Sequence, residues 1–362
     1  YPGHGGAVYN SGLIGTIEGN FIGNYTDATA PTVSGGAIRN SGSIQNIIGD
    51  FIANSSTTHG GAIQNSGYIG NITGDFIDNR SSQYYGAAIS INTQFDANED
   101  ARIDSINGNF IANEARIGSA ISVIHGSIGS ITGSFISNSG DSAICGRYAE
   151  IESINADFIG NIGAVKNDGS TINNLSGRFI NNQSSNGNGG AVFNGVVYAY
   201  DQSSLIKNIT SAEFVGNYFA DDDPGNGIIA KGGAIYNASD GTIEAVSDTS
   251  FVGNYAYSAG YGVGGNTYGG AIYNEGSIGS LNADFIGNYS HQSGQDSAYG
   301  GAIYNTGSID SITGDFIGNY SKTDGAMASF GGAIDNGGTI GTITGNFIGN
   351  YVNAGGSAYG GA

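Results

Sequence analysis

One four-residue motif, Phe-x-x-Asn, marks twelve successive repeats along the 362-residue chain and limits its possible folds more than any other feature. The copies begin at Phe21, Phe51, Phe76, Phe110, Phe135, Phe158, Phe179, Phe214, Phe251, Phe285, Phe316 and Phe347. The intervals between copies range from 21 residues (158 to 179) to 37 residues (214 to 251). Repeats of this length are typical of solenoids, in which each unit packs only on its neighbours. We therefore expect residues 1–362 to form a single repeat array.

A second motif, Gly-Gly-Ala, alternates with the first and is followed by a column of β-branched residues. That column reads Val8, Ile38, Ile63, Ile89, Ile121, Ile144, Val165, Val192, Ile235, Ile272, Ile303 and Ile334. The next position varies freely and includes Tyr9, Arg39 and Asp335. A β-branched position alternating with a variable one predicts a strand with one face in a core.

Asparagine occupies two further columns, which we place at corners of the fold. The first column reads Asn10, Asn40, Asn65, Asn167, Asn194, Asn237, Asn274, Asn305 and Asn336, with Ile91, Val123 and Gly146 in three repeats. The second reads Asn24, Asn54, Asn79, Asn113, Asn138, Asn161, Asn182, Asn217, Asn254, Asn288, Asn319 and Asn350. A side-chain amide can bond the backbone and the asparagines above and below it, so we expect two stacked ladders.

Between the two corners lies a segment such as Ser-Ile-Asp-Ser-Ile-Thr (308–313), whose isoleucines are expected to bracket a bend or a bulge. Each repeat thus supplies three short strands, which predicts an all-β, right-handed parallel β-helix of about twelve rungs. Leucine-rich repeats also carry an asparagine ladder, but this chain has only four leucines. Residues inserted after the second asparagine, such as 219–231 and 290–298, are expected to form a rim along one edge.

Composition narrows the possible partners. The formal net charge is −20 and the pI about 4.1, which argues against binding to nucleic acid or to an anionic membrane. The chain has no apolar run of about 18 residues, so we expect no membrane span. It has 66 glycines, yet 39% of its residues are hydrophobic and recur at fixed phase, which a disordered chain would not maintain. Cys145 is the only cysteine, and we interpret it as incidental.

The alternation of Gly-Gly-Ala-Ile/Val with Phe-x-x-Asn resembles the repeat of the polymorphic outer-membrane proteins, which are autotransporter adhesins, and adhesin-like repeats of other microbes. The resemblance covers essentially the whole chain. It implies a β-helical passenger with an adhesive role on a microbial cell surface, outside the cell. A host or cell-surface glycan or protein is the partner that this resemblance implies.

The segment from Asp96 to Asp104 contains the strongest metal-binding pattern. Read as a calcium loop, it would use Asp96, Asn98, Asp100, the Arg102 carbonyl and Asp104 as ligands. Ala101 stands where such loops have glycine, and Asn107 where they have a bidentate acid. We predict calcium here, with a solvated acidic loop as the alternative.

No catalytic cluster is apparent, so we predict a protein that is not an enzyme. The variable column carries Arg39, Lys166 and Asp335 many rungs apart, and His4, His59, His125 and His291 fall in different repeats. The alternative is a glycan-active β-helix of the polysaccharide lyase or hydrolase type, which would need paired carboxylates or a calcium cluster.

The repeats over 86–167 depart from the Gly-Gly-Ala pattern. We interpret this departure as sequence drift, with a specialised site as the alternative.

Tyrosines form outward columns that predict stacks and a contact surface. These are Tyr236, Tyr273 and Tyr304 in the first strand and Tyr289 and Tyr320 after the second asparagine.

The chain starts and stops on the same motif, which predicts either part of a longer chain or a subunit that associates head to tail into filaments. Ice binding through serine and threonine ranks such as Ser277 and Ser280 is a third alternative.

Overall fold

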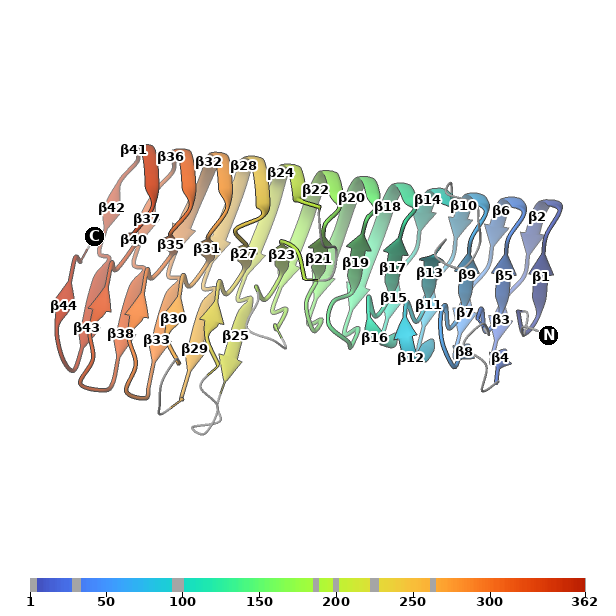
Figure 1. The fold of residues 1–362 in the computed structure, drawn as a ribbon, viewed down its shortest axis with the longest axis horizontal. Coiled ribbons are helices and arrows are strands. Elements are labelled where there is room, and N and C mark those ends of the chain that lie inside the picture. Colours follow the sequence, from blue (N-terminus) through green and yellow to red (C-terminus); the bar gives the residue numbers. More distant parts are fainter. Residues whose placement is uncertain are drawn as a thin grey trace. The chain divides into compact units, whose positions relative to one another are not determined.

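The computed structural model describes residues 5–27, 34–92, 101–184, 189–197, 202–221, 228–260 and 265–361. These residues form parallel strands and turns, wound as a right-handed parallel β-helix, as the repeats predicted (Figure 1). None of the described residues belongs to a helix that could cross a membrane. The chain divides into two compact units, Tyr1–Asn174 with Val197–Gln202 and Leu175–Val196 with Ser203–Ala362.

The strand after Gly-Gly-Ala builds the first sheet of each unit, and its strands pair in parallel with the same repeat positions in register. In the first unit it consists of β1 (Val8–Asn10), β5 (Ile38–Asn40), β9 (Ile63–Asn65), β13 (Ile89–Asn92), β17 (Ile121–Ile124), β19 (Ile144–Arg147) and β21 (Val165–Asp168). In the second unit it consists of β23 (Val192–Asn194), β27 (Ile235–Asn237), β31 (Ile272–Asn274), β35 (Ile303–Asn305) and β40 (Ile334–Asn336).

The second sheet of each unit carries the Ser-Ile-x-Ser-Ile-Thr segment and the phenylalanine. In the first unit it contains β2 (Leu13–Glu18), β3 (Phe21–Ile22), β6 (Ser43–Ile48), β7 (Phe51–Ile52), β10 (Tyr68–Thr73), β11 (Phe76–Ile77), β14 (Arg102–Asn107), β15 (Phe110–Ile111), β18 (Ser127–Ile136) and β20 (Glu150–Ile159). In the second it contains β24 (Ser204–Val215), β28 (Gly241–Val252), β32 (Ser277–Ile286), β36 (Ser308–Thr313), β37 (Phe316–Ile317), β41 (Thr339–Thr344) and β42 (Phe347–Ile348); β22 (Thr171–Ile180) contains the division between the units. Isoleucines three apart, such as Ile309 and Ile312, are both buried, although strict alternation would place them on opposite faces of the strand.

The segments after the second asparagine form additional sheets. The first unit has a third sheet of β4 (Tyr25–Thr26), β8 (Ser55–Ser56), β12 (Arg80–Tyr85) and β16 (Glu114–Ile117). The second unit has a third sheet of β25 (Tyr218–Asp221), β29 (Tyr255–Ser258), β33 (Tyr289–Gln292), β38 (Tyr320–Thr323) and β43 (Tyr351–Ala354). Its fourth sheet consists of β26 (Ala230–Lys231), β30 (Thr267–Tyr268), β34 (Ala298–Tyr299), β39 (Ser329–Phe330) and β44 (Ala358–Tyr359). The expected rim of the second unit is therefore a pair of regular parallel sheets.

Phenylalanine rings stack through the core of each unit. In the first unit, Phe51, Phe76, Phe110 and Phe135 are fully buried, and the ring centroids of successive phenylalanines lie 4.6 to 4.8 Å apart. The same stack recurs in the second unit from Phe179 onwards. Parallel strands in register impose this arrangement, because each ring meets the same ring one strand spacing away. The stack fills the interior with one repeated side chain.

The second asparagine column forms the predicted ladder. Asn254 shows the pattern: its Nδ2 donates to Asn288 Oδ1 at 2.9 Å and to the Phe214 carbonyl at 2.8 Å. Its Oδ1 accepts from the backbone N–H of Asn217 at 2.9 Å and from Asn217 Nδ2 at 3.0 Å. The same contacts join Asn24, Asn54 and Asn79 in the first unit. Because the column is buried, each amide satisfies backbone groups that the corner would otherwise leave without partners.

Both glycines of Gly-Gly-Ala are required at their corner, for different reasons. Gly269 has a φ of +61°, in the left-handed region that side chains disfavour. Gly270 lies against the next rung, and a Cβ there would be 2.2 Å from the Gly301 carbonyl oxygen. The predicted tight corner with positive φ is therefore confirmed at the first glycine of the motif. The second glycine is needed because the backbone of the next rung approaches it too closely for a side chain.

Replacing Asn254 by alanine should lower the free energy of unfolding by about 3 kcal/mol, since it leaves the Asn217 N–H and the Phe214 carbonyl buried without partners. Urea denaturation measures the change. Asn282→Ala is the matched control: Asn282 is exposed on the adjacent rung, and its loss should change stability by less than about 0.5 kcal/mol. Equal effects from the two substitutions would contradict a stabilising role for the ladder.

Candidate functional site

Four strands of the first unit's first sheet depart from the common pattern. Strands β13, β17, β19 and β21 have four residues, whereas β1, β5 and β9 have three. Their outward side chains form two rows in register, and we call these eight residues the covered face. The first row is Ser90, Ser122, Cys145 and Lys166, and the second is Asn92, Ile124, Arg147 and Asp168.

These outward side chains are shielded from solvent although they point away from the core. Six of the eight residues are buried, and the side chains of Arg147 and Lys166 are only 11% and 13% exposed. On the inner side of three of these rungs, Ile91, Val123 and Gly146 replace the first asparagine ladder. The change of the inner column and the burial of the outer rows coincide, which favours a specialised region over drift.

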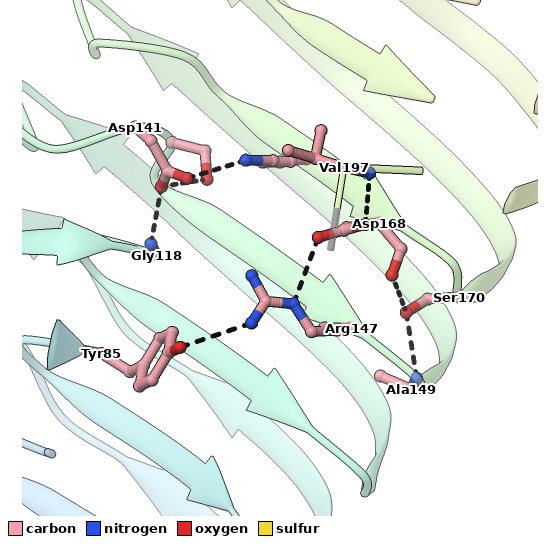
Figure 2. Close-up of polar contacts among 10 residues, drawn as sticks. Tyr85, Gly118, Asp141, Arg147, Ala149, Asp168, Ser170 and Val197 are labelled. Atoms are coloured by element: carbon pink, nitrogen blue, oxygen red, sulfur yellow. Dashed lines mark hydrogen bonds and ion pairs between the residues drawn. The ribbon is translucent and has the colours of Figure 1, made fainter. Parts of the chain in front are cut away.

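Two buried ion pairs organise the covered face (Figure 2). Arg147 Nε lies 3.1 Å from Asp168 Oδ2, and Lys166 Nζ lies 3.0 Å from Asp141 Oδ2. The other oxygens of the two carboxylates accept backbone N–H groups, Asp168 Oδ1 from Val197 at 2.8 Å and Asp141 Oδ1 from Gly118 at 3.0 Å. Burying a charge is costly unless it is paired and hydrogen-bonded, and both conditions are met here.

Cys145 lies beside Lys166 of β21 and two residues before Arg147 in β19. Burial, followed by the charge of Asp141, raises the pKa of its thiol to about 12. A cysteine of this kind stays protonated at neutral pH and is a poor nucleophile. Its environment agrees with the interpretation of Cys145 as an incidental residue.

Three polar atoms on the adjacent strands β9, β13 and β17 have no hydrogen-bond partner within the described part of the chain. They are Gln64 Oε1, Ser90 Oγ and Ser122 Oγ. Their residues occupy the same column on the adjacent strands β9, β13 and β17, so they form a row across three rungs. All three are buried, with exposed fractions of 5% or less.

Aromatic rings lie at one side of the covered face. His59 stacks on Tyr84 and Tyr85, with centroid distances of 5.5 and 5.4 Å. Tyr85 reaches the covered face itself, because Arg147 Nη1 donates to its hydroxyl at 3.3 Å and the guanidinium lies 5.7 Å from its ring centroid. Burial, followed by the charge of Arg39, lowers the pKa of His59 to about 4, so the imidazole is neutral at physiological pH.

Sequence reasoning found part of this region. It singled out Arg39, Lys166 and Cys145 in the variable column and noted the altered repeats over 86–167. It missed Asp141, Arg147 and Asp168. The available signal was the replacement of the first corner glycine by Asp141, and of small residues after the strand by Arg147 and Asp168.

The predicted calcium loop falls largely outside the described residues, which exclude Asp96, Asn98 and Asp100. Of the remaining ligands, Arg102 and Asp104 lie in β14, where the Asp104 carboxylate accepts hydrogen bonds from Arg102 Nε and, at 2.6 Å, from the Tyr68 hydroxyl. Among described residues, no group of three or more His, Cys, Asp or Glu side chains is placed to hold a metal ion. Calcium binding stays a prediction.

The tyrosine columns of the second unit stack as expected, but they differ in exposure. Tyr236 and Tyr273 are each only 6% exposed, because both hydroxyls donate to Glu275 and Lys231 Nζ donates to Tyr236 at 3.0 Å. An exposed contact surface is therefore wrong for these two residues. Tyr304 is half-buried against Tyr268 and Tyr273, with centroid distances of 4.7 and 5.2 Å.

The other column, which we call the tyrosine rank, lies on the outer side of the third sheet. It consists of Tyr218, Tyr255, Tyr289, Tyr320 and Tyr351, with successive ring centroids 4.9 to 5.0 Å apart and rings within 10° of parallel. Each ring face is covered by its neighbour, so the rank presents ring edges and hydroxyls.

No family model matches the chain, and comparison with curated proteins and with solved structures gave no significant match.

Proposed function

We propose that this chain is a structural and adhesive β-helix of a microbial cell surface, located outside the cell. The observation that carries the proposal is the tyrosine rank of the second unit. A parallel β-helix holds equivalent outward residues in straight rows at the spacing of its strands. A row of five phenols is a regular contact surface of the kind that an adhesive protein needs, and tyrosine is enriched at protein interfaces.

The chemistry of the rank indicates the kind of contact. Burial, with the neighbouring phenols Tyr320 and Tyr255, raises the pKa of Tyr289 to about 12, and the pKa of Tyr320 is also raised. Tyr289 and Tyr320 therefore remain neutral hydrogen-bond donors and acceptors at physiological pH. Because the ring faces are stacked on one another, a glycan or protein of a host or microbial surface would be bound through the hydroxyls and ring edges.

The contacts of the carboxylates at the covered face, and the protonation of its cysteine, support a non-catalytic role. The carboxylates of Asp168 and of the neighbouring Asp141 have ion-pair partners and backbone donors, and Cys145 is held as the thiol. A general acid or base must reach the substrate, and both carboxylates are already occupied by a cation and a backbone N–H. We accordingly favour a binding and structural function over glycan cleavage.

Replacing Tyr255, Tyr289 and Tyr320 together by phenylalanine keeps the stacked rings and removes three hydroxyls. We expect binding to immobilised neutral glycans or extracellular matrix proteins to fall at least about tenfold, with the urea unfolding curve unchanged. Surface plasmon resonance measures the affinity. Tyr299→Phe is the control, since the equivalent position of the next rung is already Phe330. An unchanged affinity of the triple variant would overturn the role of the rank.

Head-to-tail association is a second part of the proposal. In the last described rung, Phe347 and Ile343 are 38% and 43% exposed, whereas Phe316 and Ile312 directly beneath them are fully buried. Further chain or a second copy stacked on this rung would bury these rings and methyl groups. Contacts of this heterologous kind do not close and produce filaments.

Sedimentation velocity over a range of concentrations tests this association for the 362-residue chain. We expect species larger than the 36.6-kDa monomer to grow with concentration. Ile343→Lys should abolish them, because it places a charge in the stacking surface. Ile348→Lys should not, since Ile348 is 54% exposed and points outward on the same rung. A monomer at all concentrations would contradict the proposal.

A further inference from the structure

An aspartate interrupts the tyrosine column of the second unit's first sheet. Tyr236, Tyr273 and Tyr304 occupy the same outward position of β27, β31 and β35, and Asp335 occupies it in β40 (Figure 1). Asp335 is half-buried, and burial raises the pKa of its carboxyl group, against the lowering effect of a backbone hydrogen bond from Asn336. No cationic side chain of the described residues pairs with this carboxylate. A partly buried charge without a counter-ion is unfavourable, so the fold alone does not explain the aspartate.

The neighbouring fourth sheet lies against this column with aromatic rings. Tyr299 of the fourth sheet contacts Tyr304 with ring centroids 5.5 Å apart, and the preceding rung repeats this contact at 5.4 Å. Phe330 and Asp335 occupy the equivalent positions of the next rung, in register with Tyr299 and Tyr304. A carboxylate therefore stands where the two preceding rungs have a phenol ring.

The missing ring leaves one side of Tyr304 without an aromatic neighbour. The rings in contact with Tyr304 are those of Tyr268, Tyr273 and Tyr299, which belong to its own rung and to the preceding one. Within the described residues no ring contacts Tyr304 from the rung of Asp335, because an aspartate cannot continue the stack. A ring-shaped ligand at this position packs on Tyr304 and lies beside the carboxylate.

The same surface already holds an ammonium group a few rungs away. Lys231 Nζ lies 4.6 Å from the ring centroid of Tyr236, 5.5 Å from that of Tyr273 and 3.8 Å from Glu275 Oε1. A cation over aromatic rings is attracted by their quadrupoles, and a carboxylate beside it balances its charge. The rung of Asp335 offers the same two elements, a carboxylate beside a tyrosine ring, without a cation of its own.

Charge and shape together limit the ligand. It must be cationic, because the carboxylate has no counter-ion and the chain as a whole carries a net charge of −20. It must also be a ring, because it takes the place of a phenol in the column. A lysine side chain of a partner protein has the charge but not the ring, and fixing it costs more conformational entropy than fixing a rigid ring. A pyranose with a free amino group has both features.

The geometry points to a binding site for an amino sugar with a free ammonium group, such as glucosamine, formed by Asp335 and Tyr304 with Phe330 beside them. The ammonium group donates hydrogen bonds to the Asp335 carboxylate, and the C–H face of the sugar ring packs on Tyr304. The site shares no residue with the tyrosine rank, so this proposal and the proposed function can fail independently.

Isothermal titration calorimetry of the full chain near neutral pH with methyl glucosaminide, methyl N-acetylglucosaminide and methyl glucoside tests the site. We expect saturable binding of methyl glucosaminide and at least about tenfold weaker binding of the other two sugars, which carry no charge. Nα-acetyl-lysine amide, which has the ammonium group without the ring, should also bind at least about tenfold more weakly.

Each result of the titrations decides one part of the proposal. The absence of saturable binding by methyl glucosaminide overturns the site. Equal binding of the uncharged sugars overturns the role of the carboxylate, and equal binding of the lysine derivative overturns the assignment to a sugar.

Substitutions at Asp335 provide the second test. Asp335→Asn keeps the size of the side chain and removes its charge, so it should weaken the binding of methyl glucosaminide at least about tenfold. Asp335→Tyr restores the ring of the column and should abolish binding, with a melting temperature no lower than that of the unaltered chain. Asp310→Asn is the matched control that should leave binding unchanged, because Asp310 is an exposed carboxylate of β36 in the same unit. Undiminished binding by the folded Asp335 variants contradicts the site.

Discussion

The structure depends on one constraint, which is that within each unit successive rungs pair in parallel with equivalent repeat positions in register. Each inward side chain therefore meets its own kind one strand spacing away. Phenylalanine satisfies this condition by stacking its ring, and asparagine satisfies it by donating and accepting between amides, as Asn254 does with Asn217 and Asn288. Side chains with a fixed charge would repel one another in such a column, and they are absent from these two ladders in the described rungs.

The same constraint does not apply to the outward positions, and the residues at these positions differ between the two units. The second unit repeats tyrosine in its third sheet, which gives an ordered row of phenols. The first unit places unlike residues on successive strands of its first sheet, so that Arg147 reaches Asp168 in its own row and Lys166 reaches Asp141 outside its row. Where this happens, the inner asparagine ladder is also interrupted, at Ile91, Val123 and Gly146. Inner and outer changes thus occur in the same rungs.

Much of the fold could be predicted because repeated columns show inward positions in a single sequence. The strands, the burial of both isoleucines, the asparagine ladders and the stacked tyrosines all follow from residues that recur at fixed phase. The pairing of Asp141 with Lys166 could not be predicted, since the partners belong to different columns and approach across a corner. The burial of Tyr236 was missed for the same reason, because Lys231 and Glu275 come from outside its column.

The central claim is that asparagine ladders, rather than strand pairing alone, hold the corners of the helix. Hydrogen exchange measured by NMR at the backbone amides of Asn54, Asn79 and Asn113 tests it most directly. These residues lie between strands, yet each N–H donates to the Oδ1 of the next asparagine at 3.0 Å. The account predicts protection as strong as that of the neighbouring strand amides. Exchange at the rate of an ordinary exposed turn would contradict it.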